Sequence, residues 1–212
     1  LIQLCHRLNL GLGELFPEVG VEENELNRQL ALAEFNFILR EYQKAEEILD
    51  KIDSTLLIEP RQHWYYDYLK GYVIALKKGT TEEAFFYFNR IIDEAPKEGM
   101  EIMVLLAYTG MGILYENIGE IQKAEYFFNK AITDVYRYPI KETHNIWRLL
   151  NIMYYCGSFY ANIEDYQTSD ALLSHGVKIC SDNHVTYYLA RMTFQLAKNA
   201  VAQNKDCYEI MD

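Results

Sequence analysis

Residues 109–131 read TGMGILYENIGEIQKAEYFFNKA, and this stretch decides the fold class. Small and apolar residues recur in it at steps of three, nine, four and three, at Gly112, Tyr115, Ala124, Phe128 and Ala131. Steps of three and four place side chains on one face of a helix, whereas strands alternate every second residue. The turn-forming residues 117–119 fall inside the long step. The stretch therefore predicts two helices joined by a turn, with Gly112 at their point of close approach.

The same steps recur along the chain, which identifies an internal repeat. Two further sets match without a gap and a third has one extra residue: Gly157, Tyr160, Ser169, Leu173 and Gly176; Ala33, Asn36, Ala45, Leu49 and Ile52; and Gly71, Ile74, Ala84, Phe88 and Ile91. A fifth unit begins near Thr186 and matches poorly, because Lys198 and Val201 stand where the small residue and the aromatic residue belong. The pattern predicts an all-α chain with about five helix pairs over residues 17–212.

Composition excludes several classes of function. The 212 residues are 50% hydrophobic and 14% aromatic, which is typical of a packed core, and the net charge of -11 repels nucleic acid and anionic lipid. No stretch approaches a membrane span and no leader opens the chain, so we expect a protein without membrane contact. Four scattered cysteines favour a reducing, cytoplasmic compartment. The chain opens on Leu1 in what reads as the middle of a segment, so we expect a fragment of a longer polypeptide.

Motifs for catalysis or metal binding do not occur in this sequence. The five histidines form no paired ligand set, and no phosphate-binding glycine loop is present. Three acids at Glu22, Glu23 and Glu25 open a helix, where they complement the positive end of its dipole. We therefore expect a protein that is not an enzyme and has no catalytic residue, metal or cofactor, so that its function belongs to a surface.

That surface is predicted on the inner wall of the stacked pairs, which the first helix of each pair would line. Asn117, Asn162 and Gln203 recur there at one register, and an amide can donate to and accept from a peptide backbone at once. The full set of candidate peptide-binding residues is Asn117, Asn151, Tyr154, Ser158, Asn162, Gln195, Asn199, Gln203, Tyr68 and Tyr72. Two alternatives stay open: Asn117 and Asn162 could instead end helices, and the tyrosines could instead be core residues.

The repeat resembles the tetratricopeptide repeat (TPR), whose signature runs small, aromatic, turn, Ala, aromatic, Ala. This resemblance implies a right-handed superhelix of helix-turn-helix units, an α-solenoid, although the units are longer here than the usual 34 residues. Residues 1–16 resemble the end of a phage-repressor-type helix-turn-helix DNA-binding domain whose recognition helix would lie upstream of Leu1. Their alternative interpretation is a first packing helix of the solenoid.

In this order of parts, the chain resembles the cytoplasmic peptide-pheromone receptors of Gram-positive bacteria, the group of Rgg/MutR and PlcR-like transcription regulators. The resemblance implies a quorum-sensing homodimer that binds a signalling peptide in its concave groove and DNA only through the missing helix-turn-helix. It assigns peptide contacts to Asn117, Asn162 and Gln203, with Asn151 and Asn199 as second choices. Lys198 departs from the pattern and makes the register of the last unit doubtful. The alternatives are a TPR interaction scaffold and a peptide-regulated phosphatase without DNA binding.

Overall fold

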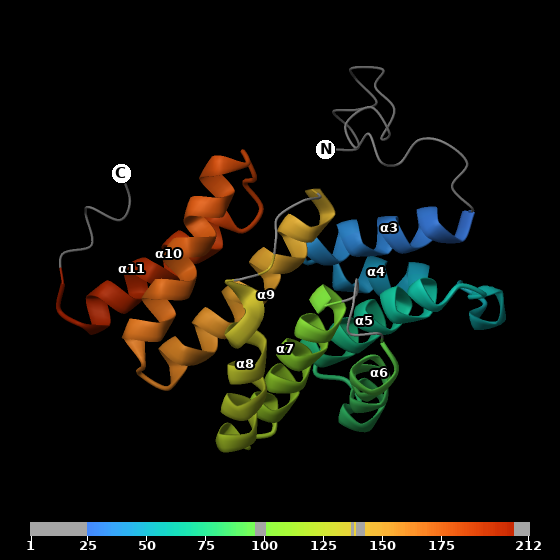
Figure 1. Cartoon of the computed structure of the whole chain (residues 1–212), viewed down its shortest axis with the longest axis horizontal. Coiled ribbons are helices and arrows are strands. Elements are labelled where there is room, and N and C mark those ends of the chain that lie inside the picture. The colour runs from blue at the N-terminus through green and yellow to red at the C-terminus, as the bar shows by residue number, and fades with distance from the viewer. Residues whose placement is uncertain (1–24, 96–100, 137, 139–142, 206–212) are drawn as a thin grey trace.

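A computed structural model describes residues 25–95, 101–136, 138 and 143–205 of the chain, and the regular elements in these ranges are all helical (Figure 1). They are α3 (Glu25–Ile38), α4 (Tyr42–Leu49), the 3-10 helix η2 (Ser54–Leu56), α5 (Pro60–Leu76), α6 (Thr81–Glu94), α7 (Glu101–Asn117), α8 (Ile121–Val135), α9 (Thr143–Asn162), α10 (Tyr166–Asp182) and α11 (Leu189–Ala202). The predicted all-α class is confirmed. The predicted helix-turn-helix remnant at residues 1–16 lies outside the described residues.

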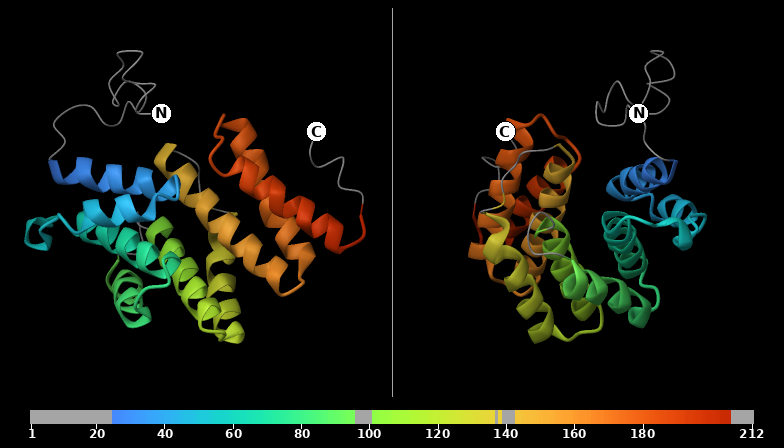
Figure 2. Two further views of the ribbon diagram at one scale, coloured as in Figure 1. Left: turned by 180° about the vertical axis from the view of Figure 1, so that it is seen from behind. Right: turned by 45° about the vertical axis from the view of Figure 1, so that its right-hand side comes forward.

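Consecutive helices form pairs, and the pairs pack in chain order (Figure 2). The first helices α3, α5, α7, α9 and α11 each contact the next in the series. The return helices α4, α6, α8 and α10 each pack between their own first helix and the following one. This arrangement places side chains of all the first helices on a shared side, which we call the inner side.

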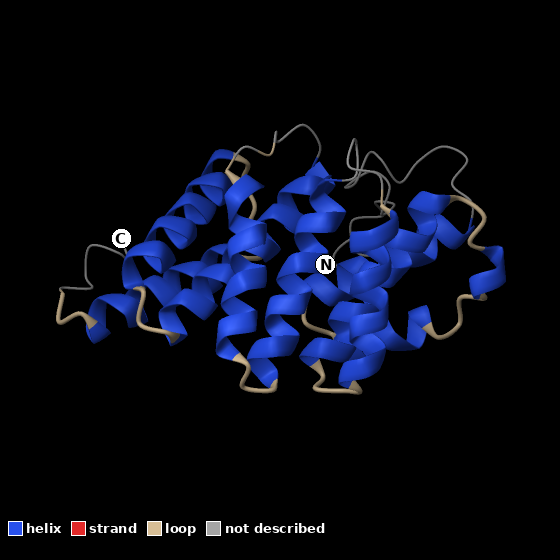
Figure 3. Cartoon of the chain, turned by 60° about the horizontal axis from the view of Figure 1, so that its bottom comes forward, coloured by secondary structure: helices blue, strands red, loops and turns tan. Residues whose placement is uncertain are grey.

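Short turns join the two helices of each pair (Figure 3). The turn between α7 and α8 passes through Gly119, whose φ of 80° lies in the left-handed region that glycine adopts at little cost. The turn between α9 and α10 uses Glu164 at a φ of 66°, so a residue with a side chain holds the same kind of position there. The first turn falls at residues 117–119, where the sequence predicts it, and the second falls within the corresponding long step between Tyr160 and Ser169.

The small residues of the repeat are the contact points between paired helices. A Cβ atom added to Gly112 would lie 2.8 Å from the ring of Phe128, and one added to Gly157 would lie 2.7 Å from the side chain of Leu173. Real Cβ atoms do not approach other atoms so closely, so only glycine lets these helices meet. The close approach predicted from the repeat is confirmed at both sites.

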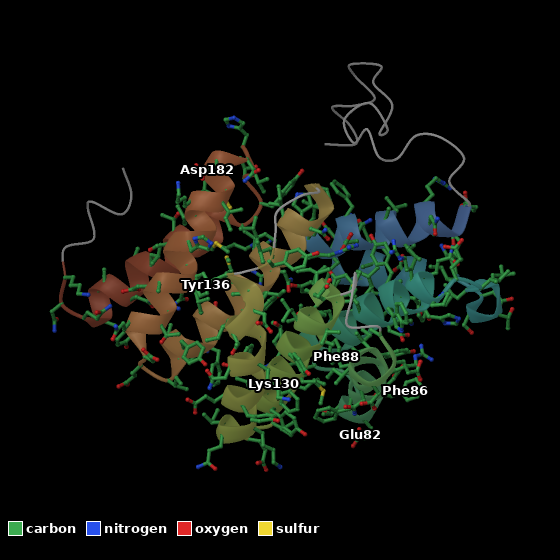
Figure 4. The ribbon with its side chains drawn as sticks, viewed as in Figure 1. Glu82, Phe86, Phe88, Lys130, Tyr136 and Asp182 are labelled. Atoms are coloured by element: carbon green, nitrogen blue, oxygen red, sulfur yellow. The ribbon has the colours of Figure 1, made fainter. Side chains whose placement is uncertain are left out.

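The core follows the repeat as one continuous layer of apolar side chains between the helices. Phe88 on α6 is fully buried and packs edge-on against the ring of Tyr72 on α5, whereas Phe86 on the same helix is 57% exposed (Figure 4). Residues two positions apart lie on nearly opposite faces of a helix, which explains why Phe88 is buried and Phe86 is exposed. Among the described helices, none combines the length and the apolar character that crossing a bilayer requires.

Candidate functional site

The inner face of α9 gathers the polar groups that define the candidate site. α9 is one of the longest helices described, and Arg148 is its only lysine or arginine. Arg148, Asn151, Ser158 and Asn162 follow one another at helical spacing, so they lie along one side of α9. α9 runs through the middle of the molecule, and α3 ends beside it (Figures 1 and 2).

Arg148 forms a buried ion pair with Glu34 of α3. The guanidinium donates from Nε to Glu34 Oε1 at 2.8 Å and from a terminal nitrogen to Oε2 at 3.2 Å. The two side chains are only 7% and 4% exposed. A two-point contact between a guanidinium and a carboxylate is directional as well as strong. The pair therefore fixes α3 against α9 across the inner side.

Two tyrosines of α5 complete this cluster, which we call the inner clasp: Glu34, Tyr65, Tyr68 and Arg148. The Tyr65 hydroxyl donates to Glu34 Oε2, and the Tyr65 ring centre lies 4.7 Å from Arg148 Cζ. The ring centre of Tyr68 lies 6.0 Å from the same atom. An aromatic face attracts a cation electrostatically, and the attraction grows when water is excluded. The inner clasp is thus built around the Arg148 guanidinium from three helices.

Electrostatics keeps the charges of the inner clasp in place. Burial by itself lowers the pKa of Arg148, but attraction to Glu34, Tyr65 and Tyr68 together with the hydrogen bonds to Glu34 outweighs it, so the pKa of Arg148 is raised. Burial, together with the neighbouring Glu34 charge, raises the pKa of Tyr65 well above its usual value. Tyr65 therefore stays a neutral hydrogen-bond donor, and Arg148 stays a cation throughout the physiological range.

Two buried polar atoms on the same side of α9 have no hydrogen-bond partner in the described part of the chain. Asn151 is 1% exposed, and its Nδ2 donates to the Tyr188 hydroxyl at 3.0 Å, whereas its Oδ1 accepts nothing. The Oγ of Ser158 is also buried and unpaired. Native proteins leave few such groups, and those that occur are explained by strain, by a functional role or by a bound water or ion. Both residues were predicted to bind a peptide.

The amides predicted at one register tie neighbouring helices together. Asn117 Nδ2 donates to the Ala75 carbonyl at the end of α5, at 3.1 Å, and Asn162 Nδ2 donates to Glu116 of α7 at 2.8 Å. Gln203 instead reaches Asp170 of α10, at 3.2 Å. Of the two open interpretations, helix termination fits the position of both residues, because α7 ends at Asn117 and α9 ends at Asn162. Asn117 and Asn162 link the ends of successive first helices.

The structure corrects the expected exposure of three more predicted site residues besides Asn151. Tyr68 and Tyr72 are 1% and 0% exposed, and the Tyr72 hydroxyl donates to the Leu106 carbonyl at 2.9 Å. Asn199 is 1% exposed and donates to Ser169 Oγ at 2.8 Å. Tyr68 and Tyr72 are core residues because they pack between successive first helices, whereas Asn199 is buried between α11 and the return helix α10. Of the tyrosine alternatives left open, core packing describes these two.

The remaining predicted residues are partly exposed. Tyr154 lies next to Tyr188, with ring centres 6.0 Å apart. Gln195 donates to Asn199 Oδ1 at 2.9 Å. Sequence reasoning assigned no role to Glu34 and missed Arg148. A lone cation in an otherwise uncharged helix was the available signal, because such a residue needs a partner when it is buried.

A second feature is the apolar face of α11 at the end of the series. Phe194 is 69% exposed and Val201 is 63% exposed. A shallow hollow beside Phe194 is lined by Thr186, Leu189, Ala190, Thr193, Phe194 and Ala197. In the repeat, Phe194 occupies the position of Tyr108, whose ring lies 6.3 Å from that of Phe127 on the return helix α8. The α11 face therefore has the character of an interhelical contact.

Comparison with protein-family models, with curated proteins and with solved structures gave no match to this chain. Within the described ranges, no group of histidine, cysteine, aspartate and glutamate residues is arranged to hold a metal ion.

Proposed function

We propose that this chain is the peptide-sensing part of a cytoplasmic transcription regulator. In this proposal the helix pairs are TPR-like units of a right-handed superhelix, and a signalling peptide binds to their inner side. The bound peptide then controls a helix-turn-helix domain to which residues 1–16 belong, as in quorum sensing. The resemblance of the repeat and of residues 1–16 supports this order of parts.

The unfilled hydrogen-bonding capacity of α9 is the observation that carries the proposal. Asn151 Oδ1 and Ser158 Oγ are buried on the inner side without partners. The main chain of an extended peptide carries both N–H donors and C=O acceptors, so it can satisfy an amide oxygen and a hydroxyl along one helix. Each bond made to a previously unpaired buried group also removes the cost of leaving it unpaired.

Binding at this place requires the inner side to open. In the structure described here, Glu34 reaches Arg148, and Arg191 donates to the Ile38 carbonyl of α3 at 3.0 Å. Both contacts hold α3, and both would have to give way to a peptide along α9. α3 is the described helix closest in sequence to residues 1–16, so its release would change the support of the proposed DNA-binding part. This is a two-state element that a ligand can bias.

We also propose that the chain forms a homodimer through the α11 face. Phe194 and Val201 expose apolar surface at the repeat positions that Tyr108 and Tyr115 use in the third pair to contact Phe127. A second copy could cover this face around a two-fold axis, in which the same patch serves both partners. A DNA-binding dimer reads two half-sites, which agrees with the proposed function.

Peptide binding to the chain of residues 1–212 is the direct test. A set of short, labelled, mainly apolar peptides is titrated by fluorescence anisotropy against the protein and against Asn151→Ala and Ser158→Ala. We expect a binding peptide to lose several-fold to about tenfold in affinity in each variant, because one hydrogen bond is worth about 0.5–1.5 kcal/mol. Ser181→Ala is the matched control, since Ser181 lies on α10, is exposed and bonds only to Val177 of its own helix.

Two results would contradict the proposal. Equal affinity of the bound peptides for the protein and for both α9 variants would place the peptide elsewhere. For the DNA-binding half, the genomic sequence upstream of Leu1 should encode the recognition helix of a helix-turn-helix domain. A coding sequence there without such a helix would leave an interaction scaffold as the better interpretation.

A further inference from the structure

Glu34 provides hydrogen-bond acceptors for Arg148 but no donor for the neighbouring Asn151 oxygen. The Glu34 carboxylate accepts both hydrogen bonds of the guanidinium. A carboxylate has no donor to offer, so Glu34 leaves the Asn151 oxygen unpaired one turn further along α9. Residues three apart on a helix are neighbours on its surface, which makes Arg148 and Asn151 parts of one site.

Glu34 also comes from a helix that is not a regular neighbour of α9. Successive first helices pack along one another, but α3 and α9 do not, and side chains of the inner clasp bridge them. A contact made by a few side chains can be exchanged for another contact of the same chemistry more readily than a long helix interface can. The exchange partner must bring a carboxylate, because a buried guanidinium without one is strongly unfavourable.

We propose that Arg148, with the rings of Tyr65 and Tyr68, is a carboxylate-binding site that Glu34 occupies in this conformation and a ligand carboxylate occupies when α3 moves away. The identity of the ligand as a peptide rests on the proposed function. Its C-terminal residue carries a carboxylate for Arg148 and a backbone N–H for Asn151 Oδ1. The C-terminus therefore satisfies both groups at once, whereas Glu34 satisfies one. An acidic side chain of a peptide would supply the carboxylate alone.

The test uses Glu34→Ala, which removes the internal occupant and leaves a space of about the size of acetate. Thermal unfolding is followed by circular dichroism in sodium acetate and in sodium chloride of equal ionic strength. A ligand that binds only the folded state stabilises it, so acetate should raise the melting temperature of Glu34→Ala by about 3 °C or more. If the variant is unfolded in chloride, the readout is recovery of the helical signal on adding acetate.

Two controls separate a carboxylate site from a general salt effect. The protein with Glu34 intact should not respond, because its own carboxylate fills the site. The double variant Glu34→Ala, Arg148→Met should not respond either, because it lacks the guanidinium. A response of the double variant equal to that of Glu34→Ala, or no response of Glu34→Ala to any carboxylate tested, would overturn the proposal.

Two further probes distinguish the source of the carboxylate. Acetyl-leucyl-alanine as the free acid has a C-terminal carboxylate with an adjacent N–H, and acetyl-glutamate amide has a carboxylate only on its side chain. We expect the free acid to stabilise Glu34→Ala at a several-fold lower concentration than acetate does, and Asn151→Ala in that background to remove the difference. Equal potency of the two probes would assign the site to carboxylates in general.

The outcome is separable from that of the proposed function. Stabilisation of Glu34→Ala by carboxylates, with no peptide binding to the intact chain, would support the carboxylate site at Arg148. It would contradict the proposed peptide-sensing function. Peptide binding that depends on Asn151 and Ser158, with no carboxylate effect on Glu34→Ala, would support the sensor and overturn the site at Arg148.

Discussion

Glu34 and Arg148 are separated by 114 positions in the chain, and their side chains meet in a buried two-point ion pair. The pair joins the first described helix to the fourth first-helix of the series. Arg191 and the Ile38 carbonyl make a second such connection, across 153 positions. A stack of repeats normally contacts only its immediate neighbours. These two contacts therefore give the array a closure that the repeat alone does not provide.

The first prediction concerns the contribution of the ion pair to stability. Glu34→Gln or Arg148→Met alone should reduce the free energy of unfolding by about 3–5 kcal/mol, because each leaves a buried group without its partner. The double variant Glu34→Gln, Arg148→Met should lose much less than the sum, since no uncompensated charge remains. Urea denaturation of the four proteins completes this double-mutant cycle.

An exposed pair is the control for that cycle. Lys178 and Asp182 lie 3.1 Å apart on α10 with side chains 71% and 59% exposed. Lys178→Met should leave stability nearly unchanged, because solvent screens such pairs. Additive losses in the Glu34 and Arg148 variants would show that the two residues do not depend on each other.

The second prediction concerns the amide ties between successive first helices. Asn117→Ala should lower the free energy of unfolding by about 0.5–1.5 kcal/mol, because the Ala75 carbonyl at the end of α5 loses its donor. Asn162→Ala should cost less, because the hydrogen bond from Asn162 to Glu116 is exposed whereas that from Asn117 to Ala75 is part-buried. Chemical denaturation measures both losses. A larger loss for Asn162→Ala than for Asn117→Ala would contradict this ranking by burial.

The sequence predicts the pairing of helices well because the signal is local. The steps that join Gly112 to Phe128 and Gly157 to Leu173 are contacts within one helix pair, and a residue spacing of 3.6 per turn is enough to find them. The turn at Gly119 is equally local. Each of these features depends on residues less than twenty positions apart.

Closure of the inner side depends instead on how much each pair rotates relative to the last. Small rotations add up along the series, and the residue steps within one pair carry no information about them. For this reason Tyr68 and Tyr72 were expected on an open wall and lie in the core. For the same reason the sequence does not pair Glu34 with Arg148, which belongs to a helix three pairs further on.

The third prediction concerns thiol reactivity. Cys156 and Cys180 are buried, and burial raises the pKa of both thiols, that of Cys180 to about 11. The thiolate is the reactive form, so both cysteines should resist iodoacetamide at neutral pH until the protein unfolds. Mass spectrometry after labelling, with and without urea, gives the modification at each site. Modification of Cys156 in the folded protein at the rate of a free thiol would contradict this prediction, because it requires the helices around Cys156 to open.

The fourth prediction concerns self-association through α11. Phe194→Glu should convert the proposed dimer to a monomer of 24.9 kDa in sedimentation experiments, because it places a charge in an apolar contact. Phe86→Glu is the matched control, since Phe86 is also an exposed phenylalanine but belongs to α6. Dissociation by both variants, or by neither, would remove the α11 face as the interface.

The last prediction concerns the dependence of stability on pH. Burial raises the pKa of Glu116 above its ordinary value of 4.5, and the hydrogen bond from Asn162 only partly offsets this. The folded state therefore binds a proton at Glu116 more readily than the unfolded state does. The contribution of Glu116 to the free energy of unfolding is fully present below the unfolded pKa of about 4.5. It is lost as the pH rises through the higher pKa of the folded state. Glu116→Gln removes this titration and keeps an oxygen for Asn162, so its stability relative to the unmodified protein should increase as the pH rises above 4.5.

Glu25 provides a control of opposite sign. Hydrogen bonds from Arg28 and Gln29 lower the pKa of Glu25, which is exposed at the start of α3. Its contribution is present above the unfolded pKa of 4.5 and is lost as the pH falls through the folded value. The relative stability of Glu25→Gln should therefore decrease with rising pH where that of Glu116→Gln increases. Parallel urea titrations between pH 4 and pH 7 measure both trends, and the same sign for the two variants would show that partial burial does not raise the pKa of Glu116.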